Sequence, residues 1–368
     1  MTRFRHLAWA VALVGCLHPD EAAAQRRKVI VDQDARGPAS TDMLSILLFL
    51  QAPDVDVLGI TLVTGDQWVK EQTQRTLRAV EVAQRTDVPV VPGAEYPLIN
   101  TKEESEWWER QYGEFSFKGA WTPRLYHPPD VVPELAEGKP TTKPLDEHAA
   151  NFIVRMVRQY PGEVTIWAGG PLTNIALALR LDPEVATLAK ELVLMGAGFN
   201  VGEGGIHRIN GRREFNWWFD PEAVRIAMSA PWKKITITPV DISVKTRLSE
   251  ELKAEIAKTS APVADYHTKF ANPSYMWDEI SAIAWMDPTI ITKQQELYVN
   301  IEIDHGASYG QTIFVEKEIP GGQGRPATER KMPSWWQVST VQWDLDLKRF
   351  YQKYIELMSR APRQGSGR

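Results

Sequence analysis

The sequence predicts one α/β domain in which helices flank a mostly parallel central sheet. Apolar segments of strand length alternate with segments of helix length from Lys28 onward, as in βαβ units. The 368 residues are 43% apolar and 24% charged, which is ordinary for a globular protein that can bury a substantial core. Neither an internal repeat nor a linker divides the chain. We therefore expect a single domain over residues 28–358 and a disordered polar tail over 359–368.

The first half of the chain begins with this alternation. Apolar strands are expected at residues 29–31, 57–63 and 88–91, and helices at 42–50 and 69–84. The segment that follows, residues 99–145, is rich in Pro, Trp, Glu and Lys and shows no clear period. We expect it to form a long excursion over the sheet, and loops of that length in compact domains are usually functional.

The second half continues in the same way. Residues 146–160 place apolar side chains on one helical face, and a glycine-rich irregular stretch covers 198–213. The remaining expected elements are strands at 164–168, 192–195 and 235–240, a helix at 173–180, a strand at 336–343 and a helix at 345–358.

Residues 1–24 have the pattern of an export signal. Two arginines precede an apolar run over 7–17, which is too short to span a bilayer, and small residues at 22–24 offer a cleavage site. The segment that ends in Cys16 also resembles a lipobox, in which case residues 1–15 are removed and a lipid on Cys16 anchors the protein. In both alternatives the protein is exported, periplasmic or secreted. No later run of about 18 apolar residues predicts a transmembrane span.

Charge and cysteine content exclude other classes. The formal net charge is -5, from 42 basic and 47 acidic side chains, and no block of five Lys or Arg occurs. Nucleic acid is therefore not an expected partner. A single cysteine permits no internal disulfide, so the stability of the fold must come from packing.

Acidic residues gather where the first strand ends. Asp32 and Asp34 follow the apolar run, and Asp42 opens the first helix after a loop of seven residues. Ligand sites in open α/β sheets lie outside the carboxyl ends of the strands, and carboxylates there repel each other unless protons or a cation neutralise them. Oxygen ligands suit Ca²⁺ or Mg²⁺, and the seven histidines show no metal-ligand spacing. The alternative is structural, with Asp42 capping the helix and Asp32 in a solvated turn.

Four further motifs carry a resemblance to a known family. They are Gly-Gly-Pro-Leu-Thr-Asn at 169–174, Leu-Val-Leu-Met-Gly at 192–196, Glu-Phe-Asn at 214–216 and Trp-Asp at 277–278. In this order, with strands and helices alternating between them, they resemble the calcium-dependent nucleoside hydrolases, the inosine-uridine preferring family. The resemblance extends from Lys28 to about Met358. It implies a nucleoside-hydrolase-like fold and, by analogy, a homo-oligomer, a dimer or tetramer.

The resemblance also implies a metal site and a reaction. Asp34 matches the carboxylate that acts as catalytic base and metal ligand. Asp42 and Asp278 match further metal ligands, and the carbonyl of Gly169 matches the backbone ligand. The implied cofactor is Ca²⁺, which activates water. The implied reaction is hydrolysis of the N-glycosidic bond of a ribonucleoside, releasing base and ribose.

Other matches concern the substrate. Met195, Glu214 and Asn216 match positions that hold the ribose, and for Glu214 and Asn216 a surface turn is the structural alternative. Trp277 stands where the inosine-uridine branch has histidine, and Asp66 where it has asparagine; both resemble the purine-specific branch, in which the base is stacked between tryptophans. The stacking partner would come from Trp107, Trp108 or Trp121 in the excursion, unless these residues serve packing.

The sequence departs from the family pattern at one loop. Seven residues separate Asp34 from Asp42 where the family has four, and Thr41 replaces an aspartate that holds a ribose hydroxyl, a contact that Thr41 would make without the charge. Arg36 in this loop would direct its charge either into the acidic site, against calcium, or toward an anionic substrate. The departures leave two alternatives to nucleoside hydrolysis: binding of a nucleoside or saccharide without turnover, and hydrolysis of another glycoside.

Overall fold

The computed structural model describes residues 26–200, 205–207, 212–323 and 326–361. The predicted export signal over 1–24, with Cys16, lies outside these residues, as do most of the predicted tail and parts of the glycine-rich stretch 198–213. No helix in the described ranges is long and apolar enough to cross a membrane.

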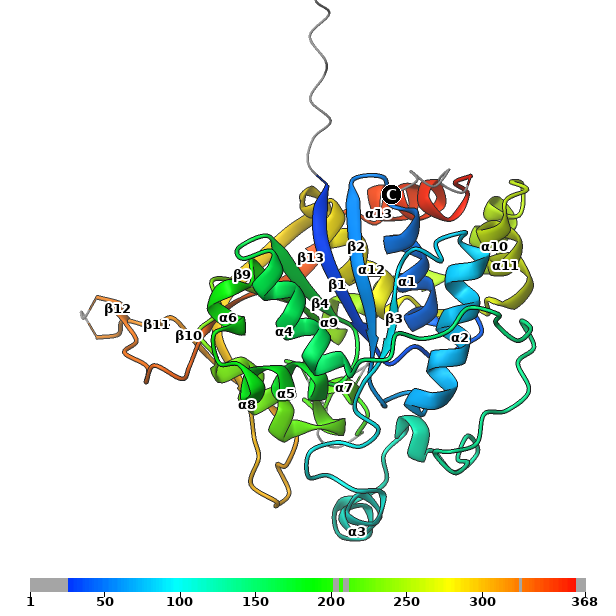
Figure 1. Ribbon diagram of the computed structural model, residues 1–368. Coiled ribbons are helices and arrows are strands. Elements are labelled where there is room, and N and C mark those ends of the chain that lie inside the picture. The colour runs from blue at the N-terminus through cyan, green and yellow to red at the C-terminus, as the bar shows by residue number, and fades with distance from the viewer. Residues whose placement is uncertain (1–25, 201–204, 208–211, 324–325, 362–368) are drawn as a thin grey trace, which may run out of the picture.

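A nine-stranded sheet forms the centre of the molecule (Figure 1). Its spatial order is β10-β9-β13-β6-β5-β4-β1-β2-β3, and every neighbouring pair from β13 to β3 is parallel. At the other edge, β9 runs antiparallel to both of its neighbours, β10 and β13. The strands are β1 (Arg27–Gln33), β2 (Val55–Leu62), β3 (Val90–Pro92), β4 (Val164–Ala168), β5 (Glu191–Met195), β6 (Ile235–Thr238), β9 (Ile291–Ile301), β10 (Thr312–Glu316) and β13 (Val338–Leu345). The α/β class with a mostly parallel sheet is thus confirmed.

Helices cover both faces of this sheet, and the alternating side chains of β1 show how. Val29 and Val31 belong to one buried core and Ile30 to the other. The first core packs under α1 (Thr41–Gln51), α2 (Val69–Val82), α10 (Glu250–Ile256), α11 (Pro262–Phe270), α12 (Trp277–Met286) and α13 (Leu347–Met358). The second packs under α4 (Ala149–Gln159), α5 (Thr173–Leu181), α6 (Val185–Leu188) and α8 (Pro221–Ser229).

Short elements complete the described chain. Two small ribbons are formed by β7 (Arg247–Leu248) with β8 (Ser274–Tyr275) and by β11 (Glu318–Ile319) with β12 (Thr328–Glu329), and the second projects from the sheet edge in Figure 1. The remaining helices are α3 (Lys102–Tyr112), α7 (Phe215–Phe219), α9 (Val240–Ser243) and the 3₁₀ turns η1 (Gly119–Trp121) and η2 (Pro288–Ile290).

The excursion over residues 99–145 contains a regular element that the sequence did not predict. Thr101 is the N-cap of helix α3, and its side chain accepts a hydrogen bond from the Glu104 amide. Only Ser105 and Trp108 of this helix are buried, so it has almost no apolar stripe from which a period could be recognised. The excursion lies at the carboxyl ends of the parallel strands, where Ala120 donates a hydrogen bond to the Gly65 carbonyl.

Candidate functional site

Four aspartates, each beside a different strand or helix, meet at the carboxyl edge of the sheet. Asp34 follows β1, Asp42 lies in the first turn of α1, Asp66 follows β2, and Asp278 lies in the first turn of α12. Parallel strands and the helices that follow them bring their ends to the same edge, which is why residues so distant in sequence converge. The edge therefore carries a cluster of carboxyl groups, here called the carboxylate cluster.

Asp34 lies in a cradle of two glycines. A Cβ atom on Gly65 would lie 2.1 Å from Asp34 Oδ2, and one on Gly170 would lie 2.9 Å from the Asp34 amide nitrogen. The Asp66 amide donates to Asp34 Oδ2 at 2.8 Å, whereas Asp34 Oδ1 is buried and has no hydrogen-bond partner. One oxygen is thus fixed by the backbone, and the other remains available to a ligand.

Asp42 and Asp278 are joined through the starts of their helices. The Thr41 hydroxyl donates to Glu279 Oε2 at 2.6 Å and accepts from the Asp278 amide at 3.0 Å. The sequence predicted Thr41 as a sugar contact. The structure places it on the wall of the cavity described below, but with its hydroxyl holding α1 against α12.

Burial is the largest cause that raises the pKa of these carboxyl groups. The pKa of Asp34 lies well above its ordinary value because of burial and then the charges of Asp66 and Asp42. Burial and the charges of Asp42 and Asp34 likewise raise the pKa of Asp278. Burial also raises the pKa of Asp42, although the Ser40 hydroxyl and the charge of Arg36 oppose that rise.

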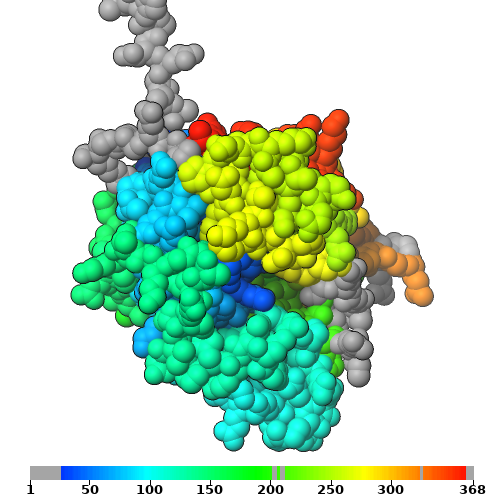
Figure 2. Space-filling view, turned by 90° about the vertical axis from the view of Figure 1, so that its right-hand side faces the viewer, coloured from blue at the N-terminus to red at the C-terminus, as the bar shows by residue number. Residues whose placement is uncertain are grey.

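A cavity of about 670 Å³ opens beside this cluster. In Figure 2 the blue N-terminal part of the chain is visible on this side of the molecule, between the yellow-green region of α10 to α12 and the teal excursion. Nine of the ten residues predicted as site residues line the cavity: Thr41, Asp42, Asp66, Gly169, Met195, Glu214, Asn216, Trp277 and Asp278. The tenth, Asp34, is 1% exposed and lies behind the lining, in contact with the Asp66 amide.

Glu214 and Asn216 organise one wall through contacts within the protein. The Glu214 carboxylate caps α7 by accepting from the amides of Asn216 and Trp217, and it also accepts from the Ala197 amide. Burial raises the pKa of Glu214 to about 7. The Asn216 side-chain amide donates to the Gly169 carbonyl at 2.7 Å. Because a carbonyl oxygen has two lone pairs, the Gly169 oxygen keeps one lone pair with which it can bind a further group.

Aromatic rings line the cavity, although they are not all the rings that the sequence suggested. Tyr275 and Trp277 have ring centroids 4.6 Å apart, and Phe117 and Phe215 have centroids 5.0 Å apart. By contrast, the three excursion tryptophans do not line the cavity. Trp108 and Trp121 are buried in an aromatic cluster with Trp218 and other rings, and Trp107 is 45% exposed.

Several lining residues were missed at the sequence level. Phe117 and Arg124 come from the excursion, where no period marks them, and Tyr275 lies in the short strand β8. Among these missed lining residues, Phe215 could have been predicted from the sequence, because it stands inside the Glu-Phe-Asn motif.

The oxygen donors of the carboxylate cluster are of the kind that a divalent metal ion prefers. Within the described ranges, no three His, Cys, Asp or Glu side chains are arranged as a ready-made metal site. The chemistry nevertheless fits a hard divalent cation, because the donors are carboxylate oxygens and Asp34 Oδ1 is a buried acceptor without a partner. The residues of the carboxylate cluster thus fit a hard divalent cation.

A carboxylate cluster and an aromatic wall surround one cavity at the carboxyl edge of a doubly covered sheet. This makes the chain an α/β protein whose cavity suits a small polar ligand with a flat, apolar part. The model of the family described as inosine-uridine preferring nucleoside hydrolase matches residues 29–352. The chain belongs to this family, whose members cleave the N-glycosidic bonds of nucleosides.

Individual relatives and structures agree with this assignment. The chain is 29% identical to the probable uridine nucleosidase 2 of Arabidopsis thaliana, over 73% of this chain and 78% of that protein. It is 27% identical to the inosine-uridine preferring nucleoside hydrolase of Leishmania major, over 78% and 87%. The solved structure of a purine-preferring ribonucleoside hydrolase from Gardnerella vaginalis shares the fold, with a TM-score of 0.69 and 20% identity over 90% of this chain and 98% of that one.

Proposed function

We propose that this protein hydrolyses the N-glycosidic bond of purine ribonucleosides, with Asp34 as the catalytic base and Ca²⁺ as the cofactor. The observation that carries the proposal is the position of Asp34. One of its oxygens is fixed by the Asp66 amide, and the other is buried without a partner among the carboxyl groups of the cluster.

The residues of the carboxylate cluster have different roles in the proposed reaction. Asp34, Asp42, Asp278 and the Gly169 carbonyl would hold the cation, which when bound supplies the Lewis acidity that makes a water molecule acidic. Asp34 Oδ1 accepts the proton of the attacking water, and Asp34 Oδ2 stays fixed by the Asp66 amide. The ribosyl carbon passes through an oxocarbenium-like state, which neighbouring carboxylates stabilise electrostatically.

The preference for purines rests on the cavity wall. A departing base must gain a proton or be held in an environment that favours protonation. Among the described residues that line the cavity there is no histidine to donate one. The rings of Trp277, Tyr275, Phe117 and Phe215 offer stacking surface instead, and base stacking is worth about 1 to 3 kcal/mol in nucleic-acid systems. A larger purine gains more from these rings than a pyrimidine does.

The test measures released base and reducing sugar from inosine, guanosine, adenosine and uridine, with calcium and with a chelator. We expect purine nucleosides to be cleaved faster, and Asp34→Asn to lose at least about a thousandfold in rate because the base is removed. Faster cleavage of uridine would overturn the purine preference alone. If no nucleoside is cleaved, or if Asp34→Asn equals the parent, the catalytic proposal is wrong.

A second candidate is a member that binds a nucleoside without turnover. It is favoured by the Thr41 hydroxyl, which is engaged by Glu279 and the Asp278 amide, and by the described carboxylates, which do not form a ready-made metal site. Calorimetric binding of inosine without release of hypoxanthine would support this candidate. Turnover at ordinary enzyme rates would exclude it.

Export is part of the proposal and has its own test. We propose that residues 1–24 direct export to the periplasm or medium, with lipidation of Cys16 as the alternative, and that the mature protein is a homo-oligomer. Mass spectrometry of the mature N-terminus separates cleavage after Ala24 from a lipidated Cys16. Retention of the full chain in the cytosol would overturn both forms of export, and light scattering of the purified protein tests the oligomer.

A further inference from the structure

The loop that separates Asp34 from Asp42, residues 35–41 with Thr41 as the first residue of α1, forms one side of the cavity. Six of its seven residues, all except Ala35, line the space beside the carboxylate cluster. This is the loop that is longer than the family pattern. The position of its side chains therefore determines how the extra length affects the carboxylate cluster. Arg36 is its only charged residue.

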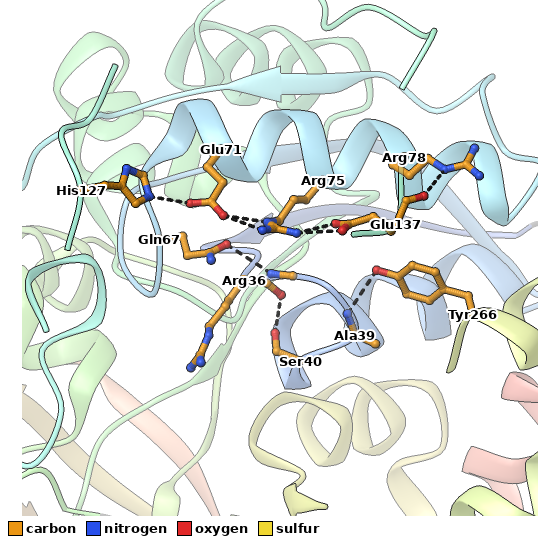
Figure 3. Close-up of polar contacts among 11 residues, drawn as sticks. Arg36, Ala39, Ser40, Gln67, Glu71, Arg75, Arg78, His127, Glu137 and Tyr266 are labelled. Atoms are coloured by element: carbon orange, nitrogen blue, oxygen red, sulfur yellow. Dashed lines mark hydrogen bonds and ion pairs between the residues drawn. The ribbon is translucent and has the colours of Figure 1, made fainter. Parts of the chain in front are cut away.

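The loop is held in place from several sides (Figure 3). The Gly37 amide donates to Gln67 Oε1 at 3.3 Å, and the Ala39 amide donates to the Tyr266 hydroxyl of α11 at 3.1 Å. The Ser40 hydroxyl contacts both the Arg36 carbonyl and Asp42 Oδ2, and its single proton serves one of them at a time. These contacts fix the backbone from the Arg36 carbonyl to Ser40.

A buried row of ion pairs on α2 supports the same loop. Arg75 bonds Glu71 Oε1 at 2.8 Å and both oxygens of Glu137 at 2.7 and 2.9 Å, and His127 contacts the other oxygen of Glu71. A Cβ atom on Gly37 would lie 2.7 Å from Arg75 Cδ, so the loop packs directly on the arginine stem. Both acidic partners of Arg75 are therefore satisfied by that row, and neither is left over for Arg36.

The Arg36 side chain points away from this row (Figure 3) and toward the cavity. Its Nη1 lies 4.0 Å from Asp66 Oδ2, and the side chain is 36% exposed. Its positive charge reaches Asp42 as well, since it partly offsets the rise in the pKa of Asp42 and of Asp66 that burial causes. Arg36 is thus a positive charge held beside the carboxyl groups that would bind a cation.

We propose that Arg36 is a fixed counter-cation of the carboxylate cluster, and that it lowers the affinity of the cluster for Ca²⁺. The inference rests on the calcium site of the proposed function. An arginine does not lose its charge at any pH at which the protein is folded, so a divalent cation entering the cluster is always repelled by it. The anchored loop prevents Arg36 from escaping by a backbone movement. Arg36 therefore tunes metal occupancy, without itself binding the metal.

Arg124 provides a matched comparison. It lines the same cavity and is exposed, and no contact with a carboxyl group of the cluster is found for it within the described residues. Removing its charge tests whether any positive charge at the cavity lowers calcium affinity, or only the one that the loop holds against Asp66.

The experiment is calorimetric titration of the metal-free full-length mature protein with CaCl₂ at low ionic strength. We expect Arg36→Gln to bind Ca²⁺ roughly tenfold more tightly than the parent, because a nearby like charge is removed. Arg36→Lys keeps the charge and Arg124→Gln leaves it in place, so both should stay within about threefold of the parent. Raising the salt concentration should shrink the effect of Arg36→Gln, because exposed charges are screened. Circular dichroism and thermal melting confirm that each variant is folded.

The outcomes separate this inference from the proposed function. Equal or weaker calcium binding by Arg36→Gln overturns the inference, even if the parent hydrolyses nucleosides. The absence of calcium binding by both parent and Arg36→Gln also overturns it. Tighter binding by Arg36→Gln in a protein that cleaves no nucleoside supports the inference and contradicts the proposed function. An equal gain in Arg124→Gln would show that the effect is one of net charge, and would overturn the specific role of Arg36.

Discussion

At Asp34 two backbone segments approach more closely than any residue other than glycine allows. A Cβ atom on Gly65 would come within 2.8 Å of the Cβ and Cγ atoms of Asp34 and still closer to Oδ2. The Asp66 amide, one residue further on, holds the same carboxylate. The absent side chain of Gly65 therefore determines where the carboxylate of Asp34 lies.

This predicts the effect of Gly65→Ala. The added methyl group must displace Asp34, so we expect a loss of roughly a hundredfold in the rate of hydrolysis of the best nucleoside, as a misplaced catalytic group typically causes. Overpacking should cost about 1 to 3 kcal/mol of unfolding free energy. Gly306→Ala is the control, because a Cβ atom there meets nothing within 4 Å. A Gly65→Ala variant with parental activity would show that Asp34 does not need this position.

At the scale of elements, the site depends on the junction between the starts of α1 and α12. Thr41 belongs to α1, and it contacts the Asp278 amide and the Glu279 carboxyl group of α12. The two helices also pack along their lengths within one core. A single hydroxyl thus fixes the helix start that carries Asp278 relative to the helix start that carries Asp42.

Thr41→Val removes that hydroxyl with little change in shape. It leaves the Glu279 carboxyl group and the Asp278 amide without this partner in a buried setting, so we expect a loss of about 1 to 3 kcal/mol in unfolding free energy. Thr41→Ser keeps the hydroxyl and should lose much less. Urea denaturation of the three proteins measures the difference. Equal stability of Thr41→Val and the parent would contradict the role of this junction.

Elements with a clear apolar period could be predicted from the sequence, and those without one could not. The strands β1, β4 and β5 are short buried runs, and α4 has one apolar face. Helix α3 and the half-exposed strand β9 lack that signal. The site residues were found because motifs mark them, but their contacts were not. The Thr41 hydroxyl meets an amide 237 residues away, and sequence spacing does not reveal such a contact.

For the whole molecule, gathering carboxyl groups at one buried edge has a thermodynamic consequence. Burial raises the pKa of Asp32 and Glu214 to about 7, of Glu279 to about 8, and of Asp220 to about 6. These four carboxyl groups therefore bind more protons near pH 6 in the folded protein than in the unfolded chain. By linkage, these groups make the fold less stable as the pH rises from about 4 to about 8.

Asp220 allows one such contribution to be isolated, because it lies at the start of α8, apart from the carboxylate cluster. It accepts hydrogen bonds from Thr173, Leu98 and Ala223, but burial dominates and raises its pKa from 3.8 to about 6. Ionisation of Asp220 therefore lowers the free energy of unfolding. This cost is absent below pH 4 and reaches its full value, at most about 3 kcal/mol, above about pH 6.5.

Asp220→Asn loses an acceptor and is expected to be less stable than the parent at low pH. The parent's advantage should shrink by up to this amount between pH 4 and pH 7, as chemical denaturation at several pH values would measure. An advantage that stays constant or grows over this range would mean that Asp220 does not titrate with a raised pKa in the folded protein.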